Sequence, residues 1–260
     1  MSKIYSLSEQ GLSAPEQGSA EWLEGRKGKI TGSKPSDLYF NFKQESDWDE
    51  ILDKWFGDSV ENFDAVARKR MAWGSKHEDT AVKVIVEAIP NSHFFECPQL
   101  LISEIYAASP DGAIIVLKEG SQGRVVKEEL RPEDVEWHAN VEIKCPGGGI
   151  GKTFEEMRAI VEKKWKAPAP YYMMQIHQEM ASQKTSETLF VVWTPLLTRM
   201  WRIPFNRSFW NLCLEVLENF RLKNVSFEVM QSKVQKLKRR CFGVSNFPIW
   251  KEVHHTHTEL

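Results

Sequence analysis

The sequence is best interpreted outward from two segments, Ser109-Pro110-Asp111-Gly112 and Val141-Glu142-Ile143-Lys144-Cys145-Pro146. Successive side chains of a β-strand point to opposite faces, so Glu142 and Lys144 would share one face while Ile143 enters the other. Asp111 lies at a turn or a strand start, and from a neighbouring strand it would bring a second carboxylate to the same place. Oxygen ligands of this kind suit a hard cation such as Mg²⁺, which keeps several of its waters.

These residues therefore predict metal-assisted hydrolysis of phosphodiesters, in which a lysine orients or deprotonates a metal-bound water and offsets charge at the phosphate. Each motif also has an ordinary explanation. An E-x-K triplet is typical of a solvated strand face, and Pro-Asp-Gly is typical of a turn. Three features favour the nuclease: apolar residues flank the E-x-K strand, the Pro-Asp-Gly follows a strand-like run, and both acids precede a helix-forming segment.

The bulk composition is that of an ordinary globular protein. The 260 residues are 42% hydrophobic and 27% charged, with a formal net charge of -2, so any DNA-binding surface has to be a local basic patch. This length holds one large domain or two small ones, with a substantial core. The four cysteines are far apart and form no C-x-x-C pair, which disfavours zinc and disulfide scaffolds and indicates a reducing compartment: Cys97, Cys145, Cys213 and Cys241.

Neither a signal peptide nor a membrane span is expected. The start, MSKIYSLSEQ, lacks an apolar run. No segment approaches the roughly 20 apolar residues that span a bilayer. We therefore expect a cytoplasmic protein.

Hydrophobic periodicity predicts helices first and short strands from residue 93 onward. We expect an N-terminal arm over 1–20, a single domain over 21–245 and a tail over 246–260. Helices are expected over 46–57, 60–88, 152–164, 171–183 and 206–222, with Trp73-Gly74 interrupting the second. Strands are expected over 93–103, 106–108, 112–117, 124–127, 139–144, 188–194 and 200–205, with 117–138 as a hairpin extension.

A basic, glycine-punctuated turn before the long helices has two interpretations. Ser33 and Ser36 are expected N-caps of the next helix, and backbone N–H groups there, with Arg26 nearby, would form an anion pocket suited to a phosphate. The alternative is a charged turn with an ordinary cap.

Other polar positions are equally open. On the helix over 171–183, Tyr172, Gln175, Ile176 and Glu179 share one face, where the glutamine either binds water or phosphate or is a plain polar residue. The glycine run after Pro146 is expected to be a flexible loop, because it lacks the Lys-Ser/Thr spacing of a phosphate-binding loop. The basic cluster Lys233, Lys236, Lys238, Arg239 and Arg240 either lines a DNA channel or is a solvated helix end, and His254, His255 and His257 are expected in an unstructured tail.

The order of the motifs resembles the phage lambda exonuclease family, the YqaJ-like viral recombinase group of the PD-(D/E)xK nucleases. The resemblance covers residues 20 to 205 and rests on five ordered motifs, Trp22…Arg26…Ile30-Thr31-Gly32-Ser33, Ala72-Trp73-Gly74…Glu78, Ser109-Pro110-Asp111-Gly112, Glu142-Ile143-Lys144-Cys145-Pro146 and Tyr172-Met173-Met174-Gln175. It implies an α/β fold with a restriction-endonuclease-like core, a mixed and mainly antiparallel sheet flanked by helices.

The resemblance also implies an activity. Members of this family are Mg²⁺-dependent 5′→3′ exonucleases that digest one strand from double-stranded DNA ends and leave a 3′ single-stranded overhang for recombination by strand annealing. The implied site holds two Mg²⁺ ions, for which Mn²⁺ substitutes. The implied assembly is a trimeric ring that threads the duplex and works beside a single-strand annealing protein, in the bacterial host cytoplasm if phage or prophage encoded.

Roles for individual residues follow from the same resemblance. Asp111 and Glu142 would hold the metal ions, with the Ile143 carbonyl as a further ligand. Lys144 would act on the attacking water, which Glu78 and Gln175 would help to position.

The remaining assignments concern DNA. Arg26, Ser33 and Ser109 resemble the pocket for a terminal 5′-phosphate, Met71 falls where the family places an apolar wedge that splits the end base pair, and Tyr172 is carried over as a DNA contact. The sequence departs from the family in the length of the 118–138 segment, where the family often has a tight hairpin.

Two other functions remain open at this point. A related PD-(D/E)xK endonuclease of restriction or repair type would cut closed circular DNA, which an exonuclease leaves intact. The other is a non-catalytic DNA-end-binding recombination protein. Mg²⁺-dependent release of nucleotides that is lost in Lys144→Ala would exclude it.

Overall fold

The computed structural model describes residues 19–57, 64–96, 101–102, 105–121, 131–147 and 153–255. Its helices are α1 (Ala20–Arg26), α2 (Ser36–Phe40), α3 (Ser46–Phe56), α4 (Ala65–Ala88), α5 (Phe154–Lys164), α6 (Tyr172–Gln183), α7 (Arg207–Leu222) and α8 (Phe227–Gly243). Its strands are β1 (Ile30–Thr31), β2 (Ser92–Glu96), β3 (Leu101–Ile102), β4 (Tyr106–Ala108), β5 (Gly112–Leu117), β6 (Val135–Lys144), β7 (Glu187–Trp193), β8 (Leu197–Pro204) and β9 (Lys251–His254).

Several helices begin at a side chain that accepts a hydrogen bond from the exposed backbone of the first turn. Asp64 accepts from the N–H of Ala67 at 2.7 Å at the start of α4. Thr153 and Glu156 form a reciprocal capping box at the start of α5. Because such caps satisfy donors that have no partner within the helix, they fix where these helices begin.

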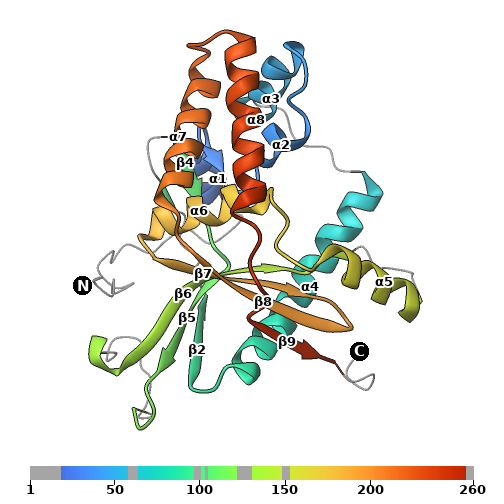
Figure 1. Ribbon diagram of the computed structural model, residues 1–260, viewed down its shortest axis with the longest axis vertical. Coiled ribbons are helices and arrows are strands. Elements are labelled where there is room, and N and C mark those ends of the chain that lie inside the picture. The colour runs from blue at the N-terminus through green and yellow to red at the C-terminus, as the bar shows by residue number, and fades with distance from the viewer. Residues whose placement is uncertain are drawn as a thin grey trace.

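The strands form two sheets. The large sheet has the order β2-β5-β6-β7-β8-β9, in which only the β6–β7 pair is parallel, and the small sheet has the order β1-β4-β3. The expected fold, a mixed and mainly antiparallel sheet flanked by helices, is therefore confirmed (Figure 1).

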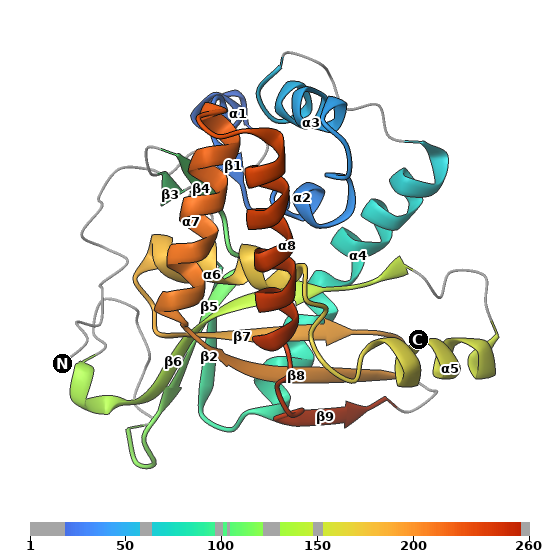
Figure 2. The same ribbon diagram turned by 45° about the horizontal axis from the view of Figure 1, so that its top comes forward.

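Helices cover both faces of the large sheet, and the alternation of side chains along β7 shows why. Phe190 and Val192 belong to the core under α6, α7 and α8, whereas Leu189 and Val191 belong to the core under α4. Figure 1 and Figure 2 show the first group of helices on one side of the sheet and α4 crossing the other side. A strand buried on both faces needs apolar residues at nearly every position, as β7 has.

The β5–β6 pairing positions the predicted site. Gly112 lies opposite Val141, so Asp111, immediately before β5, lies next to Glu142. A glycine is required here: a Cβ at position 112 would lie 2.3 Å from Cζ of Phe94. The Pro-Asp-Gly motif therefore combines a carboxylate with a close approach of strand β2.

Two local predictions in the N-terminal half are wrong. Helix α4 continues through Trp73-Gly74 without interruption, because one glycine destabilises a helix by only about 1 kcal/mol, which tertiary packing overrides. Ser33 and Ser36 do not cap α2, whose N-cap is Pro35 without a side-chain hydrogen bond. Ser36 instead donates to the Ser33 carbonyl at 2.6 Å.

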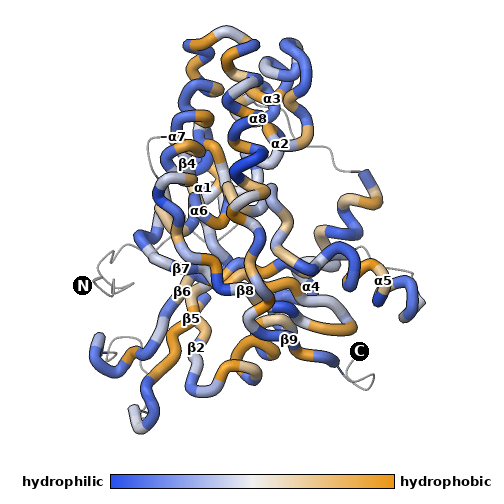
Figure 3. Tube along the Cα trace, in the orientation of Figure 1, coloured by the Kyte–Doolittle hydropathy of each residue, from blue (hydrophilic) through white to orange (hydrophobic). Residues whose placement is uncertain are grey.

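The C-terminal part contains more structure than the sequence predicts. The basic cluster lies on α8, whose buried positions Met230, Val234, Leu237 and Cys241 pack into the core, and Figure 3 shows hydrophilic and hydrophobic residues alternating along it. Part of the expected tail forms β9, which pairs with β8. His255, expected in an unstructured tail, hydrogen-bonds through Nε2 to the Thr198 hydroxyl at 3.0 Å.

An arginine ties this added strand to the helical layer. Arg199 on β8 is 9% exposed and forms an ion pair with Glu252 on β9. It also donates to the carbonyl of Trp165, directly after α5, at 2.8 Å. Because that carbonyl ends a helix and lacks a helical partner, Arg199 acts as its cap.

Several predictions concern residues outside the described ranges: most of the N-terminal arm, Cys97, the strand over 124–127, the glycine loop over 148–151 and the end of the tail with His257. Of the helices in the described ranges, none has the length and apolar character that crossing a membrane requires.

Candidate active site

The β5–β6 pair brings the predicted acids together. The Asp111 carboxylate accepts a hydrogen bond from the Ile143 N–H at 2.7 Å. Glu142 and Lys144 form an ion pair on the face covered by α6, while Ile143 is buried against the α4 side of the sheet. The alternation expected of this strand is thus present, and it places two carboxylates and an ammonium side by side.

Helix α6 adds an amide and a further acid. Gln175 donates through Nε2 to Glu142 Oε1 at 2.6 Å and to Glu179 Oε1 at 2.9 Å. Glu142 and Glu179 are each only 1% exposed. Since both N–H groups of the amide face carboxyl groups, its carbonyl oxygen faces elsewhere, and the orientation of Gln175 is fixed by its neighbours.

The site has an excess of acids over bases. Burial raises the pKa of Asp111 to about 8, with the nearby Glu142 charge adding to the effect. Burial, followed by repulsion from Glu142, holds the pKa of Glu179 well above its usual range. Burial alone would lower the pKa of Lys144, but attraction to Glu142 and Asp111 outweighs it and raises that pKa. The cluster is therefore short of positive charge.

Residues at the rim complete this cluster. Glu78 on α4 is exposed as a whole residue, but its carboxyl group is partly removed from water, which raises its pKa. The charge of Lys144 opposes part of that increase. Tyr172 at the start of α6 places its ring centroid 5.3 Å from Lys144 Nζ, and burial raises the pKa of its hydroxyl. Burial also raises the pKa of the Cys145 thiol to about 12, so this cysteine is a packing residue rather than a nucleophile.

The carboxylates fit a divalent cation. Glu142 Oε2 is buried and has no hydrogen-bond partner, an arrangement that usually costs free energy unless a ligand compensates. Within the described parts of the chain, no group of three or more His, Cys, Asp or Glu side chains is arranged to hold a metal ion. The predicted ligand set has only two carboxylates, because its third member is the Ile143 carbonyl.

Two of the three residues predicted for a 5′-phosphate, Ser33 and Ser109, lie beside this cluster. Parallel pairing puts Thr31 of β1 opposite Ala107 of β4, so Ser33 and Ser109 follow adjacent strands at the same edge. A Cβ on Gly32 would lie 3.3 Å from Cγ of Gln175, which shows that this turn packs directly on the site.

The other two DNA-binding predictions fall on separate helices. Arg26 ends α1 and stacks at 4.0 Å over the Trp22 ring, so its place in the phosphate pocket stays a prediction. Met71 on α4 is 53% exposed, so its side chain is accessible to a ligand.

Sequence reasoning missed the part played by Glu179. The signal was present, because Glu179 follows Gln175 by one helical turn on the same face. What was missing is that this face packs against β6, which only the fold determines.

Comparison with known proteins found similarity in sequence to one family and in fold to solved structures. A family model described as the YqaJ-like viral recombinase domain matches residues 21–186. The structure is similar to the crystal structure of an alkaline exonuclease (LHK-Exo) from Laribacter hongkongensis, with a TM-score of 0.52 and 20% identity, covering 86% of this chain and 99% of that one. The structure of LHK-Exo in complex with dAMP matches with a TM-score of 0.50 at the same identity and coverage. No curated protein matches the sequence.

Proposed function

This chain belongs to the YqaJ-like viral recombinase family, and from that premise we propose that it is a Mg²⁺-dependent 5′→3′ exonuclease of double-stranded DNA ends. It would leave 3′ single-stranded overhangs for strand annealing. The family and the restriction-endonuclease-like fold shared with alkaline exonucleases support a DNA nuclease. The observation that carries the proposal is the meeting of Asp111, Glu142 and Lys144 at adjacent strands.

In the proposed site, Asp111, Glu142 and the Ile143 carbonyl would hold two divalent cations. Such ions neutralise charge on the scissile phosphate and lower the pKa of the attacking water when bound. The partnerless Oε2 of Glu142 supports this assignment. Mg²⁺ is the expected ion, since the ligands are oxygens, and Mn²⁺ is expected to substitute.

The other side chains act on orientation and charge. Lys144, held as an ammonium by its ion pair with Glu142, donates to an oxygen of the phosphate or of the attacking water. Gln175 holds Glu142 Oε1 in place, which keeps the second oxygen of that carboxylate directed into the site. Glu78 and Tyr172 lie at the rim, where they position water and DNA.

Direction of digestion would come from the turn beside Gln175. Ser33 and Ser109, with Arg26, would bind a 5′-terminal phosphate, because hydroxyl and guanidinium donors suit a phosphate dianion. The scissile phosphodiester would then lie at the carboxylates, one nucleotide further along the strand. Binding through phosphates is independent of sequence and sensitive to salt.

The proposed assembly is a trimeric ring around the duplex that works with a single-strand annealing protein in the cytoplasm of a bacterial host. The family supports this part of the proposal. A ring would let the enzyme stay on one duplex through many cuts.

One experiment tests polarity, end recognition and mode of cutting together. Linear duplexes carrying a 5′-phosphate on one strand and a 5′-hydroxyl on the other are incubated with Mg²⁺, beside closed circular DNA. We expect only the phosphorylated strand to disappear and the circle to remain, and Lys144→Gln to abolish the loss of that strand. Equal loss of both strands would contradict the phosphate pocket, and cutting of the circle would identify an endonuclease.

A further inference from the structure

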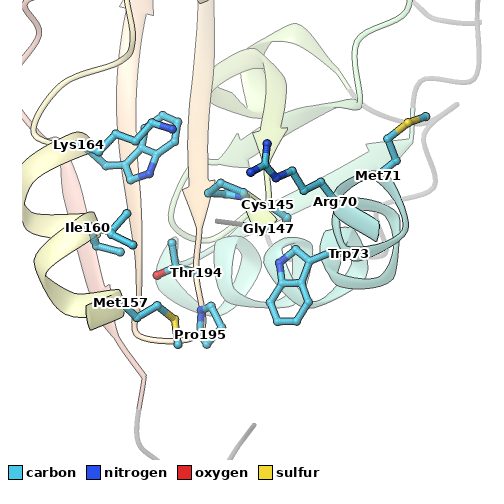
Figure 4. A pocket seen from close by; sticks show the side chains of 13 residues that line it. Arg70, Met71, Trp73, Cys145, Gly147, Met157, Ile160, Lys164, Thr194 and Pro195 are labelled. Carbon is cyan, nitrogen blue, oxygen red and sulfur yellow. The ribbon is translucent and has the colours of Figure 1, made fainter. Parts of the chain in front are cut away.

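A cavity of about 390 Å³ lies next to the catalytic cluster, where the substrate DNA strand would continue past the carboxylates. It lies beyond the carboxyl ends of the parallel strands β6 and β7, between α4 and α5 (Figure 4). Cys145 and Pro146, which follow Lys144 directly, form part of its wall. Ligands in open α/β sheets commonly bind outside the carboxyl ends of strands, and this volume is within the range of small-molecule pockets.

The lining of the cavity suits a ligand that is both flat and anionic. Figure 4 shows Arg70 and Trp73 reaching in from α4 and Lys164 lying on α5 across the cavity. Among the described residues that line it, none is Asp or Glu. Aromatic walls with cations at the edge are the combination that binds single-stranded nucleic acid, since bases stack on rings while cations contact phosphates.

Trp73 is held in place as a stacking surface. Its ring lies 4.2 Å from that of His77, which in turn stacks at 4.6 Å and 16° on Trp193 of the sheet. Neighbouring side chains therefore fix the ring before any ligand arrives, and a rigid aromatic surface suits a partner that stacks on it.

The cavity and the predicted phosphate turn lie on different sides of the carboxylates. The Gly32 turn packs on Gln175 of α6, over one face of the sheet, whereas the cavity lies beyond the strand ends, where Cys145 faces α4 and Trp165 belongs to the core under α6. A strand with its 5′ end at the serines and its first phosphodiester at Glu142 would therefore have its second nucleotide at the cavity.

We propose that this cavity binds the nucleotide on the 3′ side of the scissile phosphodiester, with its base stacked on Trp73 and its phosphates contacted by Arg70 and Lys164. The inference rests on the proposed function, because the order of nucleotides depends on 5′→3′ digestion. Each cycle would then release the first nucleotide while the second stays bound, ready to become the new 5′ end.

The test is a scan of abasic sites on the wild-type protein. Duplexes with a 5′-phosphate carry one tetrahydrofuran abasic analogue at nucleotide 1, 2 or 8, and the rate of the first cut is measured in single-turnover conditions with Mg²⁺. Stacking on an aromatic side chain is worth about tenfold or more per base, so the analogue at nucleotide 2 should slow the cut by about tenfold. The analogue at nucleotide 8 should not change it.

Two variants assign that effect to the ring. Trp73→Leu should slow the unmodified duplex by about tenfold and lose the sensitivity to the analogue at nucleotide 2, whereas Trp73→Phe should keep it. In metal-free buffer, 2-aminopurine at nucleotide 2 should lose fluorescence on binding wild-type protein and not on binding Trp73→Leu.

Several outcomes would overturn the inference. One is a first-cut rate that is unchanged by the analogue at nucleotide 2. Another is a first-cut rate that falls further with the analogue at nucleotide 1 than with the analogue at nucleotide 2. A third is a change of oligomeric state in Trp73→Leu with unaltered rates, which would assign the cavity to contacts between copies of the chain. Failure of the unmodified duplex to be cut with Mg²⁺ or Mn²⁺ would instead refute the proposed function itself.

Discussion

Replacing Glu179 tests whether ionisation of this buried acid on α6 destabilises the fold, and whether its hydrogen bond from Gln175 is needed for activity. Glu179→Gln retains an oxygen that can accept from Gln175 Nε2, now at 2.9 Å, and removes the titratable group. Glu179→Leu removes the acceptor as well. The two variants therefore separate the effect of charge from the effect of the hydrogen bond.

The size of the stability difference between the wild type and Glu179→Gln follows from its pH dependence. The pKa of Glu179 in the folded protein is raised by burial, so the folded state holds this proton more tightly than the unfolded chain does. Its stabilising contribution is complete below the ordinary carboxyl pKa and is lost as the pH rises through the raised pKa. One proton is worth at most about 1.4 kcal/mol per pH unit, so from pH 7 to pH 9 the wild type would lose up to about 2.7 kcal/mol that Glu179→Gln keeps.

The assay is urea denaturation in EDTA at pH 6, 7, 8 and 9, followed by the single-turnover cutting rate in Mg²⁺. We expect Glu179→Gln to be the more stable protein by a margin that widens as the pH rises from 6 to 9, and to cut DNA at a similar rate. Glu179→Leu should lose about 1–3 kcal/mol, because the buried amide N–H of Gln175 is left without an acceptor, and should cut about tenfold more slowly. Parallel stability profiles for wild type and Glu179→Gln from pH 6 to pH 9 would refute the reasoning.

Four further outcomes are expected. Lys144→Gln should lower the cutting rate by about a hundredfold or more while duplex binding in metal-free buffer persists, because the ammonium acts on the reacting phosphate; a rate near wild type would contradict that role. Gly112→Ala should cost about 3 kcal/mol in urea denaturation, since its Cβ would lie 2.3 Å from a ring carbon of Phe94, and wild-type stability would mean that the strand shifts freely. Burial lowers the pKa of His177 to about 4, so the unfolded chain binds this proton more tightly and the protein loses stability as the pH drops from 6.5 towards 4. Urea denaturation at pH 6.5 and at pH 5 should show that the free energy of unfolding falls by about 2 kcal/mol less in His177→Phe than in the wild type. Arg199→Met should cost about 3 kcal/mol, because it removes the cation paired with Glu252 and the donor to the Trp165 carbonyl at the end of α5. An unchanged urea midpoint would show that these contacts contribute nothing.

The parts of the fold that the sequence predicts well are those with one dominant local signal. The strand over 112–117 is a continuous apolar run that starts at a glycine and ends before a charged turn, and the structure gives it the predicted bounds. The Glu142 and Lys144 side chains share a face because alternation is a property of the strand itself.

The parts that it predicts poorly depend on contacts between distant segments. Helix α8 has buried residues at helical spacing, but the lysines and arginines between them look like a charge cluster until α7 supplies the apolar surface that they flank. Gly74 resembles a helix break, but the packing of α4 on the sheet outweighs the cost of about 1 kcal/mol that one glycine has inside a helix. Strand β9 has no apolar alternation of its own, because it adds to the sheet mainly through backbone hydrogen bonds to β8.

The pairing of β9 with β8 also has a practical consequence for anyone who shortens this polypeptide. Removing residues 251–254 would leave those backbone N–H and C=O groups of Leu197–Met200 that face β9 without their partners. Unpaired strand edges recruit strands from other molecules, so such a trimmed version should self-associate and precipitate. A purification tag therefore belongs after His255 rather than in place of the strand.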